Sequence, residues 1–413
     1  MHSHKVAVLL LLGVLIREIF SFWTGHPSDF ELWVRLGYAI SHGGNPYGVL
    51  SPVAGLSFAD VFSATNGPTI AYLPFWPLVT GLMYVIYSHL GFSDRFAYYF
   101  LLKQPAIVGD VSLAYLLHSY VSARERTGRS MWVLRFWLLS PFTVIISGIW
   151  GMFDSIAMVF VVVTMTSANY VKRGIWTGLG IFAKSIPLIY AAPVTLKEMR
   201  KPWVFFTAIA LPTLLSLGIF AIFGWPISTV SGTLISTASK GGESMSLWDL
   251  FFYFVYLGVM QPSPTVYQIL GLLWVPALVA ITVWAFRRFR VETDYGLVQT
   301  LLVITLAFLV FKARVTEQYS IYLFALSAVD VAVWNPRRKG MLLATMAVVL
   351  IYLVVNNYFL IRFLSPVYPN FTQVESVLYQ MIGSVRYAVD FLLGSIFTIL
   401  NISYLIALLK PGK

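Results

Sequence analysis

Long apolar runs alternate with short polar segments along the whole chain of 413 residues. Most runs approach the roughly 20 residues with which an α-helix crosses a bilayer. The first run covers 6–22, and the others lie at 70–90, 98–120, 131–149, 152–168, 174–195, 203–224, 247–260, 266–286, 296–311, 319–334, 341–363 and 382–409. The pattern predicts an all-α polytopic membrane protein with about 10–13 membrane helices.

Three of these runs are interrupted or short, so we expect them to be re-entrant or to lie along the membrane surface. Segment 70–90 carries Pro74 and Pro77, segment 174–195 is broken around Lys184 to Pro187, and segment 247–260 is short for a span. Proline breaks a helix because it lacks the backbone N–H and clashes with the preceding turn. Without these three segments, we expect ten complete crossings.

Composition and charge agree with a membrane protein. Hydrophobic residues make up 58% of the chain and charged residues only 11%, with a formal net charge of +11. The Lys and Arg residues form short clusters between apolar runs, which mark cytoplasmic loops and do not make a nucleic-acid-binding face. This distribution predicts that 124–130, 287–290 and 335–339 are cytoplasmic. It places the loops 23–66, 225–246, 311–318 and 364–381 on the outer side.

The sequence contains none of the common cofactor signatures. It has no Cys, so thiolate chemistry and disulfides are excluded. The six His residues are scattered without ligand spacing, and no Gly-rich phosphate loop is present. We therefore expect no cofactor, no resident metal and no soluble nucleotide-sugar donor.

Several ionisable residues fall within or beside the apolar runs. An ionisable group at membrane depth is costly unless it is paired or lines a wet cavity. Lys103 and Asp110 are two helical turns apart on one predicted helix face, while Asp154 and Lys184 lie near the ends of later runs. Two interpretations stay open: a shared polar pocket, or an ion-pair network that holds helices together.

The largest polar segment follows the first run and contains Asp29 and Glu31. In an extended chain these two acids point the same way, whereas in a helix they diverge by about 200°. A single acid in an outer loop is usually just solvated. Only the aromatic and turn-forming residues near Asp29 and Glu31 favour a functional role for this pair.

The order of these motifs resembles the GT-C membrane glycosyltransferases, which take sugars from polyprenyl phosphates. The similarity begins with Asp29-Phe30-Glu31 before Trp33, and continues through Asn45-Pro46-Tyr47 and Tyr72-Leu73-Pro74. Lys103 with Asp110, and Trp150-Gly151-Met152-Phe153-Asp154, follow in the family's order. The segments 183–190 and 312–322 are similar to the GPI mannosyltransferase I group.

This resemblance implies a GT-C-like bundle over a single membrane domain, 1–413, with a catalytic half at 1–225 and the remaining helices at 226–413. It implies transfer of mannose from dolichyl-phosphate mannose to a lipid-linked or glycan acceptor on the extracytoplasmic face, with inversion. Asp29 matches the family's catalytic acid and is the expected general base, with Glu31 as the alternative. The expected phosphate-binding cations are Lys184, Lys312 and Arg314, and the expected substrate-binding residues are Lys103, Asp110, Asp154, Gln318 and Tyr319.

Other interpretations remain open at this point. A divalent metal held by Asp29, Glu31 and Asp154 would be an alternative to a metal-free site. A multi-pass lipid or solute transporter would use Asp110, Asp154 and Lys184 as a coupling pathway. A noncatalytic subunit would keep the fold without the base. The membrane is expected to be that of a prokaryote, in particular an archaeon, or the endoplasmic reticulum of a eukaryote.

Overall fold

The computed structural model describes residues 2–59, 70, 72–125, 127–195, 202–228, 244–246, 248–261, 263–368 and 371–409. Within these ranges the regular elements are helices, and no strand occurs. The all-α polytopic fold predicted from the apolar runs is therefore confirmed.

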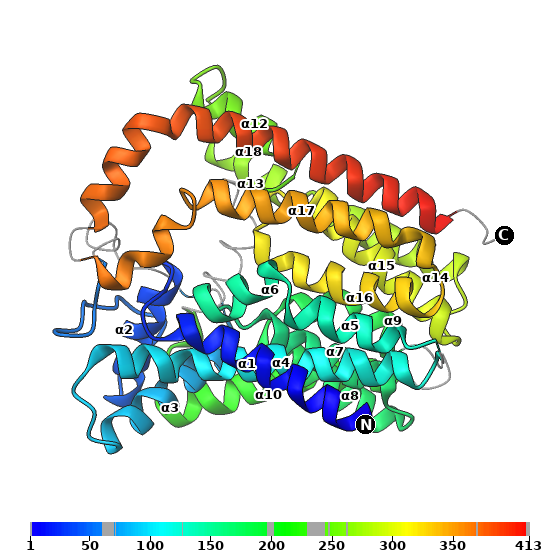
Figure 1. Ribbon diagram of the computed structural model, residues 1–413, viewed down its shortest axis with the longest axis horizontal. Helices are drawn as coiled ribbons and strands as arrows, with labels where there is room; N and C mark the ends of the chain where they lie inside the picture. The colour runs from blue at the N-terminus through cyan, green and yellow to red at the C-terminus, as the bar shows by residue number, and fades with distance from the viewer. Residues whose placement is uncertain are drawn as a thin grey trace.

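The helices pack side by side along one long direction of the molecule (Figure 1). The first half of the chain contains α1 (His2–Ser21), α2 (Asp29–Ser41), α3 (Phe75–His89), α4 (Arg95–Ser122), α5 (Arg129–Leu138), α6 (Pro141–Val144), the π-helical turn η1 (Ile145–Trp150), α7 (Asp154–Thr166), α8 (Tyr170–Ala183), η2 (Ile186–Tyr190), α9 (Ala191–Thr195) and α10 (Trp203–Phe223). The second half contains α12 (Trp248–Tyr256), α13 (Pro264–Leu272), α14 (Trp274–Arg288), α15 (Asp294–Phe311), η3 (Glu317–Tyr319), α16 (Ser320–Val333), η4 (Pro336–Arg338), α17 (Lys339–Asn356), η5 (Ile361–Val367) and α18 (Phe371–Leu409).

Each predicted apolar run coincides with a helix or with a group of consecutive helices. Among the described residues, five helices are long and apolar enough to cross a membrane, and a sixth span results if the pair Arg129–Leu138 and Pro141–Trp150, bent by 45°, counts as one. The predicted count of 10–13 included shorter pieces. Helices α3, α7, α8 and α16 have only 13 to 15 residues.

The interruption predicted near Lys184 is confirmed, because α8 ends at Ala183 and η2 begins at Ile186. Two boundaries differ from the prediction. The predicted outer loop 23–66 contains the helix α2, whose amphipathic sequence is too short for a membrane run. The predicted loop 364–381 belongs largely to α18, which begins at Phe371 because Gln and Glu residues continue the helix before its apolar part. Residues 60–66 and 229–243 of the predicted loops lie outside the described residues.

A buried ion pair joins the first helix to the centre of the fold. Arg17 and Asp110 are both fully buried, and their closest atoms are 2.5 Å apart. Asp110 also accepts hydrogen bonds from Trp137 Nε1 at 2.9 Å, Ser155 Oγ at 2.7 Å and Ser147 Oγ at 3.1 Å. These partners come from α1, α5, α7 and η1, so one carboxylate on α4 fixes four other elements.

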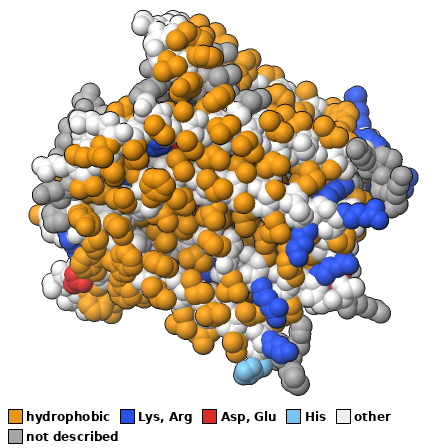
Figure 2. Space-filling model, turned by 45° about the horizontal axis from the view of Figure 1, so that its top comes forward, with side chains coloured by type: hydrophobic (Ala, Val, Ile, Leu, Met, Phe, Trp, Pro, Cys, Tyr) orange, Lys and Arg blue, Asp and Glu red, His pale blue; other side chains and the backbone are white. Residues whose placement is uncertain are grey.

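The molecular surface is broadly apolar, and its charge is concentrated at one end. Figure 2 shows hydrophobic side chains over most of the visible face and a group of Lys and Arg side chains towards the right. The connections after α7, α14 and α16 lie at that end in Figure 1. Within or directly beside them in the sequence are the exposed residues Lys172, Arg287, Arg288, Arg290, Arg337 and Lys339. Helix α2 lies at the opposite end.

We predict that Asp110→Ala lowers stability strongly, because it leaves the Arg17 guanidinium buried without a counter-charge. Breaking one partner of a buried pair typically costs about 3–5 kcal/mol. Thermal unfolding of the purified protein in detergent measures the effect as a lower Tm. The control is Glu292→Ala at an exposed loop position, which should leave Tm unchanged. Equal Tm values for both variants would contradict a central role for the pair.

Candidate active site

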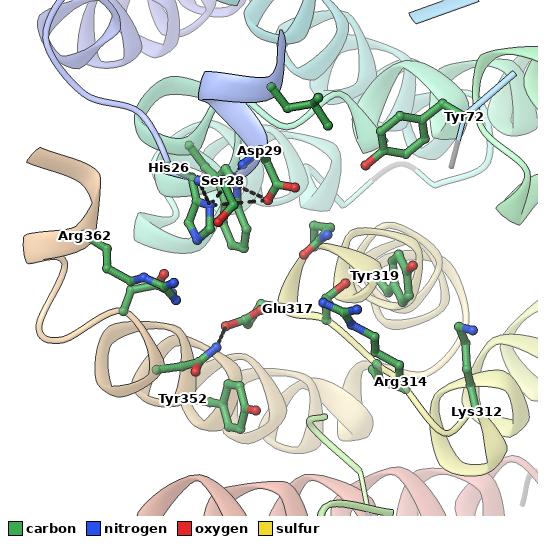
Figure 3. A pocket seen from close by; sticks show the side chains of 17 residues that line it. His26, Ser28, Asp29, Tyr72, Lys312, Arg314, Glu317, Tyr319, Tyr352 and Arg362 are labelled. Atoms are coloured by element: carbon green, nitrogen blue, oxygen red, sulfur yellow. Dashed lines mark hydrogen bonds and ion pairs between the residues drawn. The ribbon is translucent and has the colours of Figure 1, made fainter. Parts of the chain in front are cut away.

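A cavity of about 330 Å³ opens at the end of the molecule that carries α2 (Figure 3). Its walls come from both halves of the chain. One wall is formed by His26, Ser28, Asp29 and Leu32 with Tyr72 and Trp150. The other is formed by Lys312 and 314–319 with the end of α17 and Arg362. Four of the predicted site residues besides Asp29 line this cavity: Lys312, Arg314, Gln318 and Tyr319.

Asp29 lies at the first turn of α2 and points into the cavity (Figure 3). The indole Nε1 of Trp150 donates a hydrogen bond of 3.1 Å to Asp29 Oδ2. Trp150 is the last residue of η1, and Gly151 after it has a φ of +86°, which favours glycine. π-Helical turns are often found at functional sites, and here the turn directs the indole towards the carboxylate.

Burial raises the pKa of Asp29 above its ordinary value of 3.8, although the Trp150 hydrogen bond and the positive charges of Arg314, Lys184 and Arg362 oppose the shift. About a third of the Asp29 side chain (32%) is exposed, and Asp29 lines the cavity, so protein atoms surround the rest of the carboxylate. A carboxylate with a raised pKa is a stronger base than a solvated aspartate.

His26 lies beside Asp29 but does not form an ion pair with it. Its Nδ1 accepts the backbone N–H groups of Ser28 and Asp29 at 3.2 and 3.3 Å, so this nitrogen carries no proton. Burial, with a smaller contribution from Arg362, holds the pKa of His26 well below 6.5. The ring therefore stays neutral at 3.6 Å from the Asp29 carboxylate and stacks on Trp150, with the ring centroids 4.9 Å apart.

Two cations line the wall that faces Asp29. Figure 3 shows the Lys312 and Arg314 side chains on the far side of the cavity from the carboxylate. Neither cation has a carboxylate partner among the residues that the structure describes. Burial and the charge of Arg314 lower the pKa of Lys312 to about 8, and its ammonium lies 5.0 Å from the Trp274 ring centroid. Unpaired cations in a cavity bind an anionic group.

Lys184 and Asp154 form a buried ion pair of 2.7 Å behind this cavity. The Lys184 ammonium also lies over the rings of Phe153, Tyr72 and Tyr319, at 4.9, 5.6 and 5.8 Å from their centroids. Tyr72 and Tyr319 line the cavity, so Lys184 borders the site through these aromatic rings. Asp154 Oδ1 is buried without a hydrogen-bond partner among the described residues.

Three residues predicted at the site lie away from the cavity. Glu31 is fully buried, accepts from Arg35 Nε at 2.6 Å and from the Phe58 backbone at 2.9 Å, and diverges from Asp29 because α2 is helical. Asp110 is occupied by Arg17 and its other donors. Lys103 donates to the carbonyls of Thr24, Gly148 and Ile149 at 2.7, 3.0 and 2.9 Å. The contacts of Lys103 and Asp110 therefore favour the interpretation in which they form a network that holds helices together, and not the one in which they line a shared polar pocket.

Other cavity residues escaped the prediction. Trp150 appeared in the sequence only as the first residue of the motif that ends at Asp154, and His26 only as a residue shortly before Asp29, while Asn356, Asn357 and Arg362 stand at the end of an apolar run. The two adjacent Asn residues at the end of α17 were the available signal. Within the described residues, no three His, Asp or Glu side chains converge as metal ligands. The triad of Asp29, Glu31 and Asp154 does not assemble, since Glu31 pairs with Arg35.

Comparison with known proteins agrees with the resemblance seen in these motifs. No family model matches the chain. The chain is similar to GPI mannosyltransferase 1 of three yeasts. It is 22% identical to the Kluyveromyces lactis protein over 342 residues, which is 78% of each chain. It is 23% identical to the Saccharomyces cerevisiae protein over 275 residues, covering 62% of this chain and 66% of the relative, and 23% identical to the Eremothecium gossypii protein over 207 residues, 47% and 51%.

The resemblance found in the motifs is thus confirmed as a resemblance to GPI mannosyltransferase 1. The comparisons support a glycosyltransferase, specifically a mannosyltransferase, embedded in a membrane as a multi-pass protein. A sugar donor and a glycan or lipid acceptor follow from that class. The relatives are yeast proteins, so the archaeal membrane that we expected finds no support.

We predict that the cavity loses affinity for a short-chain prenyl phosphate as the pH rises from 7 to 9. Lys312 gives up its proton near pH 8, so about nine-tenths of its charge is lost over this range. The expected loss of affinity approaches tenfold. Calorimetric titration at several pH values measures it, with Lys312→Arg as the control, since a guanidinium stays charged. A wild-type affinity as constant as that of Lys312→Arg would show that Lys312 does not bind the phosphate.

Proposed function

We propose that this protein is an inverting mannosyltransferase that uses dolichyl-phosphate mannose, or a similar polyprenyl-phosphate mannose, as its donor. One observation carries the proposal: a carboxylate with a raised pKa lines the same cavity as two cations that have no carboxylate partner among the described residues. A donor with a phosphate leaving group requires such an arrangement, because the reaction needs a base and a fixed positive charge. The relatives' names support the sugar.

The proposed reaction is a single displacement at the anomeric carbon of the mannose. Asp29 removes the proton from an acceptor hydroxyl, whose oxygen forms the new bond to the anomeric carbon. The bond from that carbon to the phosphate oxygen breaks, and its electron pair leaves with the lipid phosphate. Attack from the side opposite the leaving group inverts the configuration.

Lys312 and Arg314 are proposed to bind the phosphate and to stabilise the charge that develops on its departing oxygen. Arg314 offers a planar donor set for two phosphate oxygens, and Lys312 offers a compact ammonium. Lys184 is already committed to Asp154, so we assign it a supporting part. Its charge is one of those that oppose the rise in the pKa of Asp29.

The cavity is proposed to face the extracytoplasmic side. The exposed cations Lys172, Arg288 and Arg337 lie at the end away from α2, and positive loops remain in the cytoplasm. The transporter interpretation is less favourable, because Asp110 is saturated by protein donors and Asp154 is paired with Lys184. Acidic groups of a coupling pathway must instead exchange partners during transport.

We predict that Asp29→Asn lowers kcat by about 10²- to 10⁴-fold, the usual contribution of a general base. The amide keeps the shape of the side chain but cannot accept the proton, so donor affinity should change little. Radiolabel transfer from dolichyl-phosphate mannose to a membrane-lipid extract measures the rate. The acid limb of kcat/KM in the wild type should lie above pH 3.8, because activity requires ionised Asp29.

Glu31→Gln is the matched control. Its partner Arg35 is buried, so this change should reduce stability while each folded molecule keeps its turnover. If Glu31→Gln abolished transfer and Asp29→Asn remained active, the base would be Glu31.

We predict that cysteines introduced at positions 51 and 128, both exposed, react from opposite sides of the membrane. The native chain has no Cys, so an impermeant maleimide reports only the introduced residue. In right-side-out vesicles, position 51, which is exposed, should be labelled at once and position 128 only after permeabilisation. Labelling of both positions from one side would contradict the proposed topology.

A further inference from the structure

One part of the cavity wall opposite Asp29 carries two amide oxygen atoms, Asn357 Oδ1 and Gln318 Oε1, that accept no hydrogen bond from the described residues. It consists of the end of α17 together with η3, and Figure 3 shows Glu317 and Tyr352 on this wall, away from Asp29. The mechanism proposed above uses none of its side chains. Its hydrogen bonds indicate what kind of group it binds.

Asn357 is held in one orientation by its own helix. Its Nδ2 donates 2.9 Å to the Leu353 carbonyl, which assigns the other end of the amide as Oδ1. That oxygen is buried and has no hydrogen-bond partner among the described residues, and the side chain is 1% exposed. Gln318 Oε1 is likewise buried without a hydrogen-bond partner among the described residues, and Gln318 is 6% exposed. Both residues line the cavity.

Glu317, next to Gln318, is oriented by a chain of hydrogen bonds. Asn356 Nδ2 donates to Glu317 Oε1 at 2.9 Å, and Arg386 Nη1 on α18 donates to Asn356 Oδ1 at 3.1 Å. The carboxylate of Glu317 therefore has a fixed place on the wall, 2% exposed. Fixed positions are what a site needs when it must discriminate between ligands.

Backbone strain occurs directly after Asn357. Tyr358, Phe359 and Leu360 have φ values of +49°, +57° and +69°, the left-handed region that side chains other than glycine rarely adopt. Each such residue costs about 1–2 kcal/mol. Strain of this kind persists where the surroundings hold it and is concentrated at functional sites. The strained turn joins Asn357 to Arg362, and both line the cavity.

An unsatisfied buried acceptor is costly, and a ligand that brings O–H donors removes that cost. A phosphate brings no donors at neutral pH, so this wall does not suit it. A sugar ring brings several hydroxyl donors. Because Arg314, Glu317 and Gln318 line the same cavity, a ring attached to a phosphate at Arg314 enters the part of the cavity that Glu317 and Gln318 line.

We propose that Asn357 and Gln318, with Glu317 beside them, bind hydroxyl groups of the donor's sugar ring and so determine which sugar the enzyme accepts. This inference rests on the proposed function, since it takes the phosphate to lie at Lys312 and Arg314. Sites that bind a hydroxyl through buried polar groups discriminate strongly against ligands that lack it.

The test measures binding without turnover. Calorimetric titration of the purified protein compares a short-chain polyprenyl phosphate with the same lipid phosphate bearing mannose, in the absence of acceptor. The wild type should bind the mannose-bearing lipid more tightly. Asn357→Leu should reduce this preference about 3- to 10-fold, the equivalent of one hydrogen bond, and leave affinity for the bare lipid phosphate unchanged. Arg314→Gln should weaken binding of both lipids.

Affinity for the bare lipid phosphate also reports whether each variant folds. Gln318→Met is the second variant, and Gln318→Glu, which keeps an acceptor oxygen at the same place, should retain the preference. If the preference persisted in both Asn357→Leu and Gln318→Met, or if only the acceptor's KM rose, the assignment would be overturned. A wild type that binds the donor but transfers no sugar would count against the proposed function alone.

Discussion

A charged side chain in the interior of a membrane protein needs a partner, and the Arg17–Asp110 pair meets this requirement at the centre of the fold. The carboxylate gathers donors from Trp137, Ser147 and Ser155 as well. The position of η1 depends on these bonds, because Ser147 is part of it. The last residue of η1 is Trp150, so the interior pair fixes the indole that contacts Asp29.

Lys103 extends the same principle towards the cavity. Its ammonium holds the carbonyls of Gly148 and Ile149, just before Trp150, and that of Thr24, just before His26. The two segments that surround Asp29 are thereby tied to α4. Arg17, Asp110 and Lys103 each have several hydrogen-bond partners in the interior. Lys312 and Arg314, by contrast, lack carboxylate partners among the described residues, and that difference separates the groups that build the fold from those available to a substrate.

The fold was largely predictable, because about 20 apolar residues in a row have few alternatives to a helix in a membrane. The ends of the helices were less predictable. Helix α2 is amphipathic and short, and it lies in a polar segment, so the sequence pattern predicted a loop there. At the candidate site, motif order predicted Asp29, Arg314 and Gln318, and all three line the cavity. It did not identify Asn357, whose role depends on a helix end brought near Asp29 by packing. Nor did it separate Lys103 and Asp110 from the site, since pairing with Thr24 and Arg17 is a matter of three-dimensional contact.

The most direct test of the central claim is an experimental structure of the Asp29→Asn variant with polyprenyl-phosphate mannose bound. The account predicts the phosphate between Lys312 and Arg314, with the anomeric carbon turned towards position 29 and the mannose hydroxyls against Gln318 and Asn357. A donor phosphate bound at the opposite end, near Arg287 and Arg288, would contradict it.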